Sequence, residues 1–297
     1  MFEVMSALPA DPILGLSAAF KADTNPKKID LGVGVYKDEQ GHTPILDSVA
    51  KAQTILLGKE NSKSYITPQG VQGYIDGMLQ LMLGKDCPAL LADRVAAVQA
   101  PGGCGALRVL SELIKRCDEN TTVWVSDPTW ANHIPLIGNA GLNIQTYPYF
   151  DKANANIKFD EMAECLGQVK KGDVVLLHGC CHNPTGADLS NEQWQVVLEL
   201  AQKIGFIPFV DTAYQGFGDG LEEDAYGMRL LVNNLPEVII AASCSKNFGL
   251  YRERIGIAVM VTKTVLIAKL SNLKSNLSLA ESIQCLLHMA ALWSILF

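Results

Sequence analysis

The stretch VIIAASCSKNFGLYRER, residues 238–254, joins an apolar run to a group of polar side chains. Its first five residues, 238–242, are apolar without interruption, which predicts a strand buried on both faces of a sheet. Ser243, Ser245 and Lys246 follow directly, among small and apolar neighbours. Burial there would disfavour the charged ammonium form, which makes Lys246 a candidate for Schiff-base chemistry. The alternative is an ordinary solvated surface lysine.

The overall composition indicates a globular protein. Of the 297 residues, 48% are hydrophobic and 19% are charged, which allows a sizeable core in one large domain or one domain plus part of another. The net charge is −7 with acids and bases interspersed, so we expect no nucleic-acid partner. No apolar run approaches the ~18 residues that span a bilayer, and no signal peptide is evident. Eight cysteines without a C-x-x-C pair fit reduced thiols of a cytoplasmic protein, and we expect no metal site.

Two amphipathic helices come first, one beginning at Pro44 and one over residues 71–82. From residue 95 apolar runs alternate with helical patterns. This rhythm predicts an α/β domain with a largely parallel sheet and helices on both faces. From residue 95 on, the expected strands are residues 95–99, 122–126, 142–147, 173–178, 206–210, 238–242 and 255–261.

Five polar or aromatic residues come just after predicted strands: Trp130, Asn183, Asp211, Tyr214 and Lys246. In an open α/β sheet, ligands bind at the carboxyl ends of the strands. Each residue alone has an ordinary alternative as a packing, turn, cap or rim residue. Together they meet the needs of pyridoxal phosphate. The lysine supplies an amine, the carboxylate holds the pyridine nitrogen protonated, the amide and phenol bind the phenolic oxygen, and the indole stacks on the ring.

A second group of residues suits the phosphate of such a cofactor. The glycine-rich loop 102–105 enters a predicted helix, whose first backbone N–H groups favour an anion. Ser243, Ser245 and Arg254 add hydroxyl and guanidinium donors. A glycine loop alone is weak evidence, because most such loops are only tight turns.

Seven ordered motifs resemble the class I aminotransferases, in the branch of bacterial aspartate and aromatic-amino-acid enzymes. The resemblance covers about residues 1–275 and implies the fold of fold-type I pyridoxal-phosphate enzymes. The motifs are ADPILGL (10–16), LGVGVYKD (31–38), APGGCGALR (100–108), DPTWANH (127–133), HGCCHNPTG (178–186), DTAYQGF (211–217) and SCSKNFGLYRERIG (243–256).

The resemblance implies transfer of an amino group between aspartate or an aromatic amino acid and 2-oxoglutarate. Lys246 would form the Schiff base and move the proton between the substrate Cα and the cofactor. Asp211 would pair with the ring nitrogen, with His133 against it. Tyr214 and Asn183 would bind the phenolic oxygen.

The remaining implied contacts concern the phosphate, the substrate and a second subunit. Gly103, Cys104, Ser243 and Arg254 would hold the phosphate. Tyr65 would reach the phosphate of the neighbouring subunit, which implies a homodimer. Gly34, Trp130 and Asn183 would contact the amino-acid substrate. The family usually has a hydroxyl residue where Cys104 stands, and a thiol is a weaker donor.

The predicted organisation has three parts. Residues 1–43 form an N-terminal arm and part of a small domain, 44–275 form a large cofactor-binding domain, and 276–297 form an aberrant tail. The family's chains continue past the length of this one, into a small domain carrying an arginine that clamps the substrate α-carboxylate.

The tail departs from the family pattern in a specific way. Read in a shifted frame, residues 279–290 can encode RRIYSMPPAHG, which resembles the family motif expected there. We therefore expect a frameshift between about Ser271 and Leu279. The alternative is a genuine divergent helix, since apolar residues recur at helical spacing. The corresponding alternative for function is an inactive truncated fragment that at most binds pyridoxal phosphate.

Overall fold

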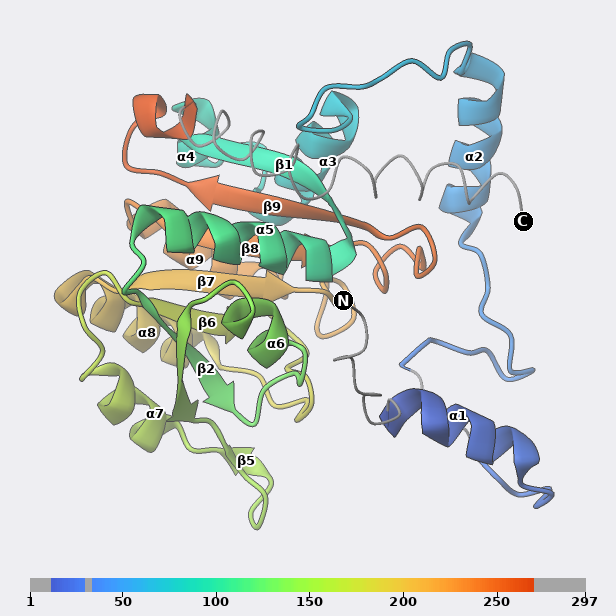
Figure 1. Cartoon of the computed structure of the whole chain (residues 1–297), viewed down its shortest axis with the longest axis horizontal. Coiled ribbons are helices and arrows are strands. Elements are labelled where there is room, and N and C mark those ends of the chain that lie inside the picture. The colour runs from blue at the N-terminus through green and yellow to red at the C-terminus, as the bar shows by residue number, and fades with distance from the viewer. Residues whose placement is uncertain (1–11, 30–33, 270–297) are drawn as a thin grey trace, which may run out of the picture. The chain divides into compact units, whose positions relative to one another are not determined.

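The computed structural model describes residues 12–29 and 34–269, and the chain divides into two compact units at residues 45 and 46 (Figure 1). The first unit contains helix α1 (Pro12–Ala22). The loop after α1 is held by Lys28, whose Nζ donates to the carbonyl oxygens of Phe20 and Asp23, at 2.7 Å each. The predicted tail, residues 276–297, lies outside the described residues.

The second unit is built on a seven-stranded sheet in the order β1-β9-β8-β7-β6-β2-β3. Pairing is parallel from β8 through β3, whereas β9 is antiparallel to both of its neighbours. The mixed, mostly parallel α/β sheet is confirmed. The strands are β1 (Val95–Pro101), β2 (Thr122–Asp127), β3 (Asn143–Pro148), β6 (Val174–His178), β7 (Ile207–Thr212), β8 (Val238–Ser243) and β9 (Ile255–Val261).

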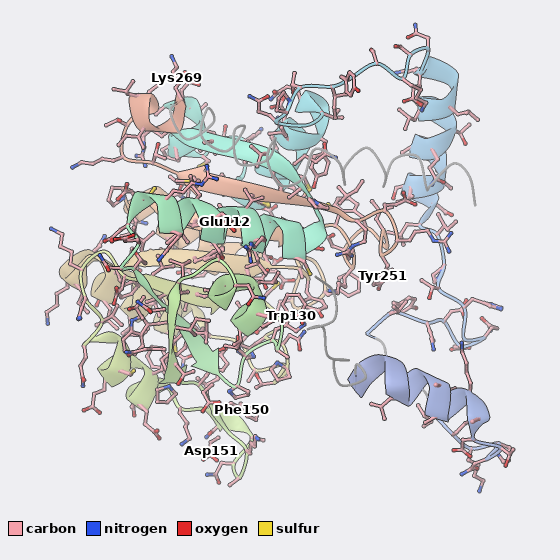
Figure 2. The ribbon with its side chains drawn as sticks, in the orientation of Figure 1. Glu112, Trp130, Phe150, Asp151, Tyr251 and Lys269 are labelled. Atoms are coloured by element: carbon pink, nitrogen blue, oxygen red, sulfur yellow. The ribbon has the colours of Figure 1, made fainter. Side chains whose placement is uncertain are left out.

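Helices cover both faces of this sheet, as Figure 1 shows for α5 and α6 on one side and α8 and α9 on the other. A short hairpin, β4 (Phe150–Asp151) with β5 (Asn156–Ile157), projects beyond the sheet and was not predicted (Figure 2). The helices are α2 (Asp47–Lys59), α3 (Gln72–Leu83), α4 (Pro88–Leu91), α5 (Gly102–Cys117), α6 (His133–Gly138), α7 (Phe159–Leu166), α8 (Asn191–Ile204) and α9 (Tyr226–Asn234).

The core forms two apolar layers, because alternate residues of a strand point to opposite faces. On β8, Ile240 packs in the layer under α3, α8 and α9, whereas Ile239 and Ala241 pack in the layer under α5 and α6. All six β8 residues are buried, as the uninterrupted apolar run predicts. Burying a side chain of this size contributes about 1.5–3 kcal/mol, so this central strand is firmly fixed and positions the polar loop that follows it.

The elements outside the sheet agree in part with the sequence patterns. A capping box of Ser190 and Gln193 begins α8. The helix expected from Pro44 begins instead at Asp47, and none of its 13 described residues is buried in the single chain. Within the described ranges, no helix is both long and apolar enough to cross a membrane. The seven cysteines in those ranges are free thiols.

Candidate active site

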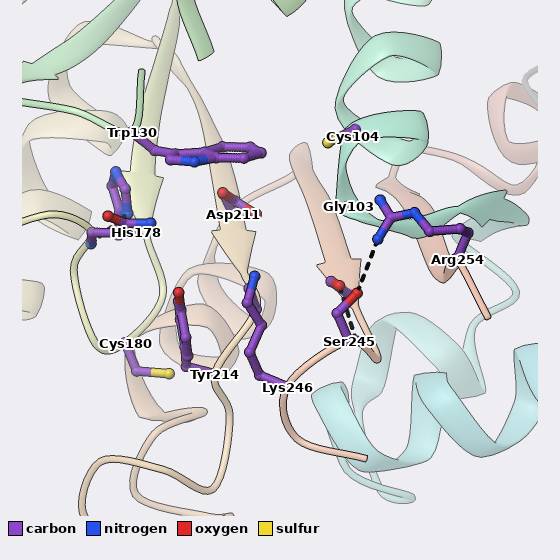
Figure 3. Close-up of a pocket in the computed structure, with 13 residues that line it drawn as sticks. Gly103, Cys104, Trp130, His178, Cys180, Asp211, Tyr214, Ser245, Lys246 and Arg254 are labelled. Carbon is purple, nitrogen blue, oxygen red and sulfur yellow. Dashed lines mark hydrogen bonds between the residues drawn. The ribbon is translucent and has the colours of Figure 1, made fainter. Parts of the chain in front are cut away.

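The carboxyl ends of β6, β7 and β8 meet the N-terminus of α5 around a cavity of about 150 Å³ (Figure 3). The reversed direction of β9 places Ile255 opposite Pro101 of β1, so Arg254 lies beside the first turn of α5. Ten residues predicted from the sequence come together here: Gly103, Cys104, Trp130, Asn183, Asp211, Tyr214, Ser243, Ser245, Lys246 and Arg254.

Lys246 extends from the loop after β8 into the middle of this cavity (Figure 3). Its Nζ lies 5.0 Å from the centroid of the Tyr214 ring. Burial lowers the pKa of Lys246, and Arg254 lowers it further, while Asp211 and Cys104 act in the opposite direction. A larger fraction of Lys246 is therefore uncharged than for a solvated lysine at the same pH. The uncharged amine is the form that attacks a carbonyl carbon.

Asp211 is oriented by a buried histidine. The Nε2 atom of His133 lies 3.0 Å from Asp211 Oδ2, and the His133 side chain is fully buried. On its other nitrogen, Nδ1, His133 meets the Thr129 hydroxyl at 2.7 Å. With the proton assigned to Nε2, His133 donates to the carboxylate and accepts from Thr129. This pair of contacts fixes the imidazole and, through it, one carboxylate oxygen.

Three further cavity residues were not predicted as site residues: His178, Cys180 and Ala213. The His178 ring is 5.2 Å from that of His133, and its Nε2 is 3.4 Å from the Thr129 hydroxyl. Burial, with His182 and His133 nearby, holds the pKa of His178 well below its usual value, so the imidazole is neutral. Its place at the last position of a buried strand was the signal that could have identified it.

The far end of the cavity offers donors to an anion. Arg254 Nη1 lies 3.5 Å from Ser245 Oγ (Figure 3), and Ser243 Oγ accepts from the Ser245 backbone N–H at 3.1 Å. Gly102 has φ +70°, and a Cβ there would lie 2.6 Å from Arg254 Nη2. A Cβ at Gly103 would lie 3.3 Å from that of Ser243. Glycine therefore allows the helix N-terminus to approach both side chains closely.

Tyr214, Asn183 and Trp130 form the other walls. Burial raises the pKa of Tyr214, as does the Asp211 carboxylate, while a hydrogen bond with Asn183 opposes the rise. The phenol therefore stays protonated and able to donate at neutral pH. The Trp130 ring meets the His133 ring edge-on at 5.3 Å, and Figure 3 shows it above Asp211.

Two predicted site residues do not line this cavity. The Tyr65 side chain is 83% exposed in the segment between α2 and α3. Gly34 is exposed and belongs to the first compact unit. Their roles remain predictions, since the resemblance assigns Tyr65 to a neighbouring subunit's site.

Comparison with known proteins gives the same family at the levels of sequence and structure. The family model for aminotransferase class I and II matches residues 26–293. The chain is 47% identical over 271 residues to the aspartate aminotransferase of Haemophilus influenzae, covering 91% of this chain and 68% of that protein. It is 46% identical over 277 residues to the aromatic-amino-acid aminotransferase of Pseudomonas aeruginosa, covering 93% and 69%.

Solved aminotransferase structures superpose closely on this chain. An aromatic amino acid aminotransferase from Burkholderia cenocepacia superposes with a TM-score of 0.92 at 38% identity, over 95% of this chain and 71% of that one. A Burkholderia pseudomallei aromatic-amino-acid aminotransferase, covalently bound to pyridoxal phosphate, gives 0.93 at 36% identity, over 98% and 74%. The chain spans about two thirds of the length of the relatives it matches. The chain thus belongs to the class I and II aminotransferases, among the aspartate and aromatic-amino-acid enzymes.

Proposed function

We propose that this chain binds pyridoxal phosphate on Lys246 and transfers amino groups between an aspartate or aromatic amino acid and 2-oxoglutarate. The observation that carries the proposal is the cavity itself. It holds a half-buried lysine with a lowered pKa, a carboxylate oriented by His133, and an anion seat at Arg254. When bound, the cofactor would supply an electron sink for the bond broken at the substrate Cα.

The residues present fit this cofactor at each of its polar ends. The N-terminus of α5, Ser243, Ser245 and Arg254 would hold the phosphate, and a Cβ at Gly102 would intrude on the Arg254 guanidinium. The backbone N–H of Cys104 belongs to the same helix turn and would add a donor. An anion at this seat would gain charge-assisted hydrogen bonds and the favourable end of a helix dipole.

The ring end would be bound by one carboxylate acceptor and by neutral donors. Asp211 would accept a hydrogen bond from a protonated ring nitrogen, and His133 keeps the carboxylate turned toward the cavity. The protonated phenol of Tyr214 and the amide of Asn183 would bind the phenolic oxygen. Trp130 would cover the ring face and exclude water, which strengthens each of these interactions.

Lys246 serves two tasks in this proposal. Its lowered pKa increases the fraction of neutral amine that can attack the cofactor carbonyl. With an amino-acid substrate in the cavity, Nζ of Lys246 would also be placed to take up and return the proton at the substrate Cα. One residue with a tuned pKa can thus act first as nucleophile and then as base and acid.

Substrate and assembly belong to the same proposal. Gly34, Trp130 and Asn183 would contact the amino-acid substrate, and Tyr65 would reach the phosphate bound by a second copy of the chain. The relatives' names support both aspartate and aromatic amino acids as substrates. We propose a cytoplasmic homodimer, and analytical ultracentrifugation of the purified chain tests the dimer directly.

The cofactor assignment is tested by chemical trapping. We expect pyridoxal phosphate to give the purified chain a visible absorption band, and borohydride reduction to fix the cofactor on the peptide containing Lys246. Lys246→Ala should abolish the trapped peptide. Lys152→Ala, a change at an exposed lysine in a turn, should leave it unchanged. A reduced cofactor found on another lysine would contradict the proposal.

Turnover is a separate measurement. Single-turnover reactions with aspartate, tyrosine and phenylalanine, followed by the cofactor spectrum, should convert the bound cofactor to its amino form. A coloured protein that no amino acid converts would contradict the transfer activity. It would instead favour the alternative, a chain that binds the cofactor without transferring an amino group.

A further inference from the structure

Two adjacent thiols and a buried carboxylate meet beside the cavity. Cys180 and Cys181 lie in the loop after β6, and Asp224 lies in the loop between β7 and α9. Cys180 and Asp224 are buried and Cys181 is half-buried. One ligand atom from each of the three residues lies within 4.8 Å of the other two. In an extended chain, the side chains of adjacent residues point in opposite directions. Cys181 has φ +50°, so the chain is not extended here and both sulfurs can face the carboxylate.

The carboxylate is fixed in place by backbone donors. Its Oδ2 accepts from the N–H groups of Gly216 and Gly218, at 2.7 and 2.9 Å. Its Oδ1 accepts from Asp219 at 2.8 Å and from Gly220 at only 3.4 Å. These four donors occupy the roughly four lone-pair sites of the carboxylate, and the bond from Gly220 is the longest, so a cation would displace a donor most easily at Oδ1. A preorganised charged ligand of this kind loses little freedom on binding a cation.

The electrostatic surroundings favour a positive ion. Asp188 lies against the same thiol loop and accepts the backbone N–H groups of Cys181 and His182, at 2.6 and 2.8 Å. Asp219 lies in the loop that wraps Asp224. Carboxylates close to the thiol pair disfavour a further anion and attract a cation.

We propose that Cys180, Cys181 and Asp224 form a binding site for a thiophilic divalent cation of the zinc and cadmium class. The two sulfurs and one carboxylate oxygen provide three ligands, and a water completes a tetrahedral set. Binding releases the two thiol protons to solvent, because the thiolates are the ligands. No electron transfer is involved. Zinc and cadmium both suit this mixed sulfur and oxygen set.

The site has a direct connection with the cavity. Cys180 is one of the residues that line it, and Figure 3 shows its sulfur directed toward the Tyr214 ring. A cation on that sulfur would therefore change the wall that faces the proposed cofactor. The site's existence is independent of the proposed aminotransferase activity, because metal binding can be measured without cofactor or substrate.

The test is a titration of the reduced full-length chain with Cd²⁺ alone, followed by ultraviolet thiolate-to-cadmium charge-transfer absorption. We expect one equivalent to bind, and Zn²⁺ to displace it. Cys181→Ser should weaken Cd²⁺ binding by at least about tenfold. Losing a residue that only hydrogen-bonds to a metal ligand already weakens metal binding by about that much, and Cys181 would be a ligand itself. Cys117→Ser, at an exposed thiol ending α5, is the matched control and should leave affinity unchanged. Equal affinity of the Cys181→Ser variant and the wild type would overturn the proposal.

A second measurement avoids any question of variant folding. The unmodified chain is alkylated with iodoacetamide with and without Cd²⁺, and each cysteine peptide is quantified by mass spectrometry. Protection of the peptide carrying Cys180 and Cys181, with Cys117 still modified, supports the site. Protection of Cys117 with no protection of the thiol pair would refute it.

Discussion

Gly102→Ala tests whether the first turn of α5 and Arg254 form the proposed phosphate seat. At this residue φ is +70°, and a Cβ would lie 2.6 Å from Arg254 Nη2 and 3.0 Å from its Cζ. The guanidinium must therefore move away from the helix N-terminus. Losing one charge-assisted hydrogen bond to the phosphate costs about 1.5–3 kcal/mol, which weakens cofactor binding by about 10- to 150-fold. Alanine at positive φ separately costs about 1–2 kcal/mol of folding stability.

Gly172→Ala separates these two effects. Gly172 has φ +87°, and within the described part of the chain no atom lies within 4 Å of a Cβ built there. This change should cost a similar folding stability and leave cofactor affinity unchanged. Affinity is measured by titrating pyridoxal phosphate and following its visible absorption, and stability by urea unfolding. If the Gly102→Ala protein folds and binds the cofactor as tightly as the Gly172→Ala protein, the seat is wrongly assigned.

Two further predictions concern Cys104 and the buried His182. Cys104→Thr should tighten cofactor binding several-fold, since one added hydrogen bond contributes about 1 kcal/mol, and an unchanged titration would reject a role of this side chain at the phosphate. Burial lowers the pKa of His182 to about 4, against about 6.5 in the unfolded chain. Between these two pKa values, His182 is protonated in the unfolded chain and neutral in the folded chain. The free energy of unfolding should therefore fall as the pH is lowered from about 6.5 to about 4. His182→Gln should flatten this slope in urea unfolding measured near pH 7 and pH 5, and an unchanged slope would show that other groups cause it.

The family, the sheet and most of the cavity lining were predictable from the sequence. The local sequence predicts the buried strands, because a run such as residues 238–242 has no polar position that could face water. The rule that ligands bind past the carboxyl ends of parallel strands then selected Asn183, Asp211 and Lys246. Asp211 lies at the end of β7, and Asn183 and Lys246 lie in the loops that follow β6 and β8, so their convergence depends on these three strands being neighbours.

Other features depend on pairing between distant segments, which no local pattern encodes. The reversal of β9 brings Arg254 against Gly102, and the sequence alone gives no strand direction for a single apolar run. The proximity of Cys181 and Asp224 likewise depends on a positive φ and on a loop wrapped around a carboxylate. The hydrogen bonds within each loop join residues that are close in sequence. The two loops themselves follow different strands, β6 and β7, so only the folded chain could show that a second polar cluster lies beside the cavity.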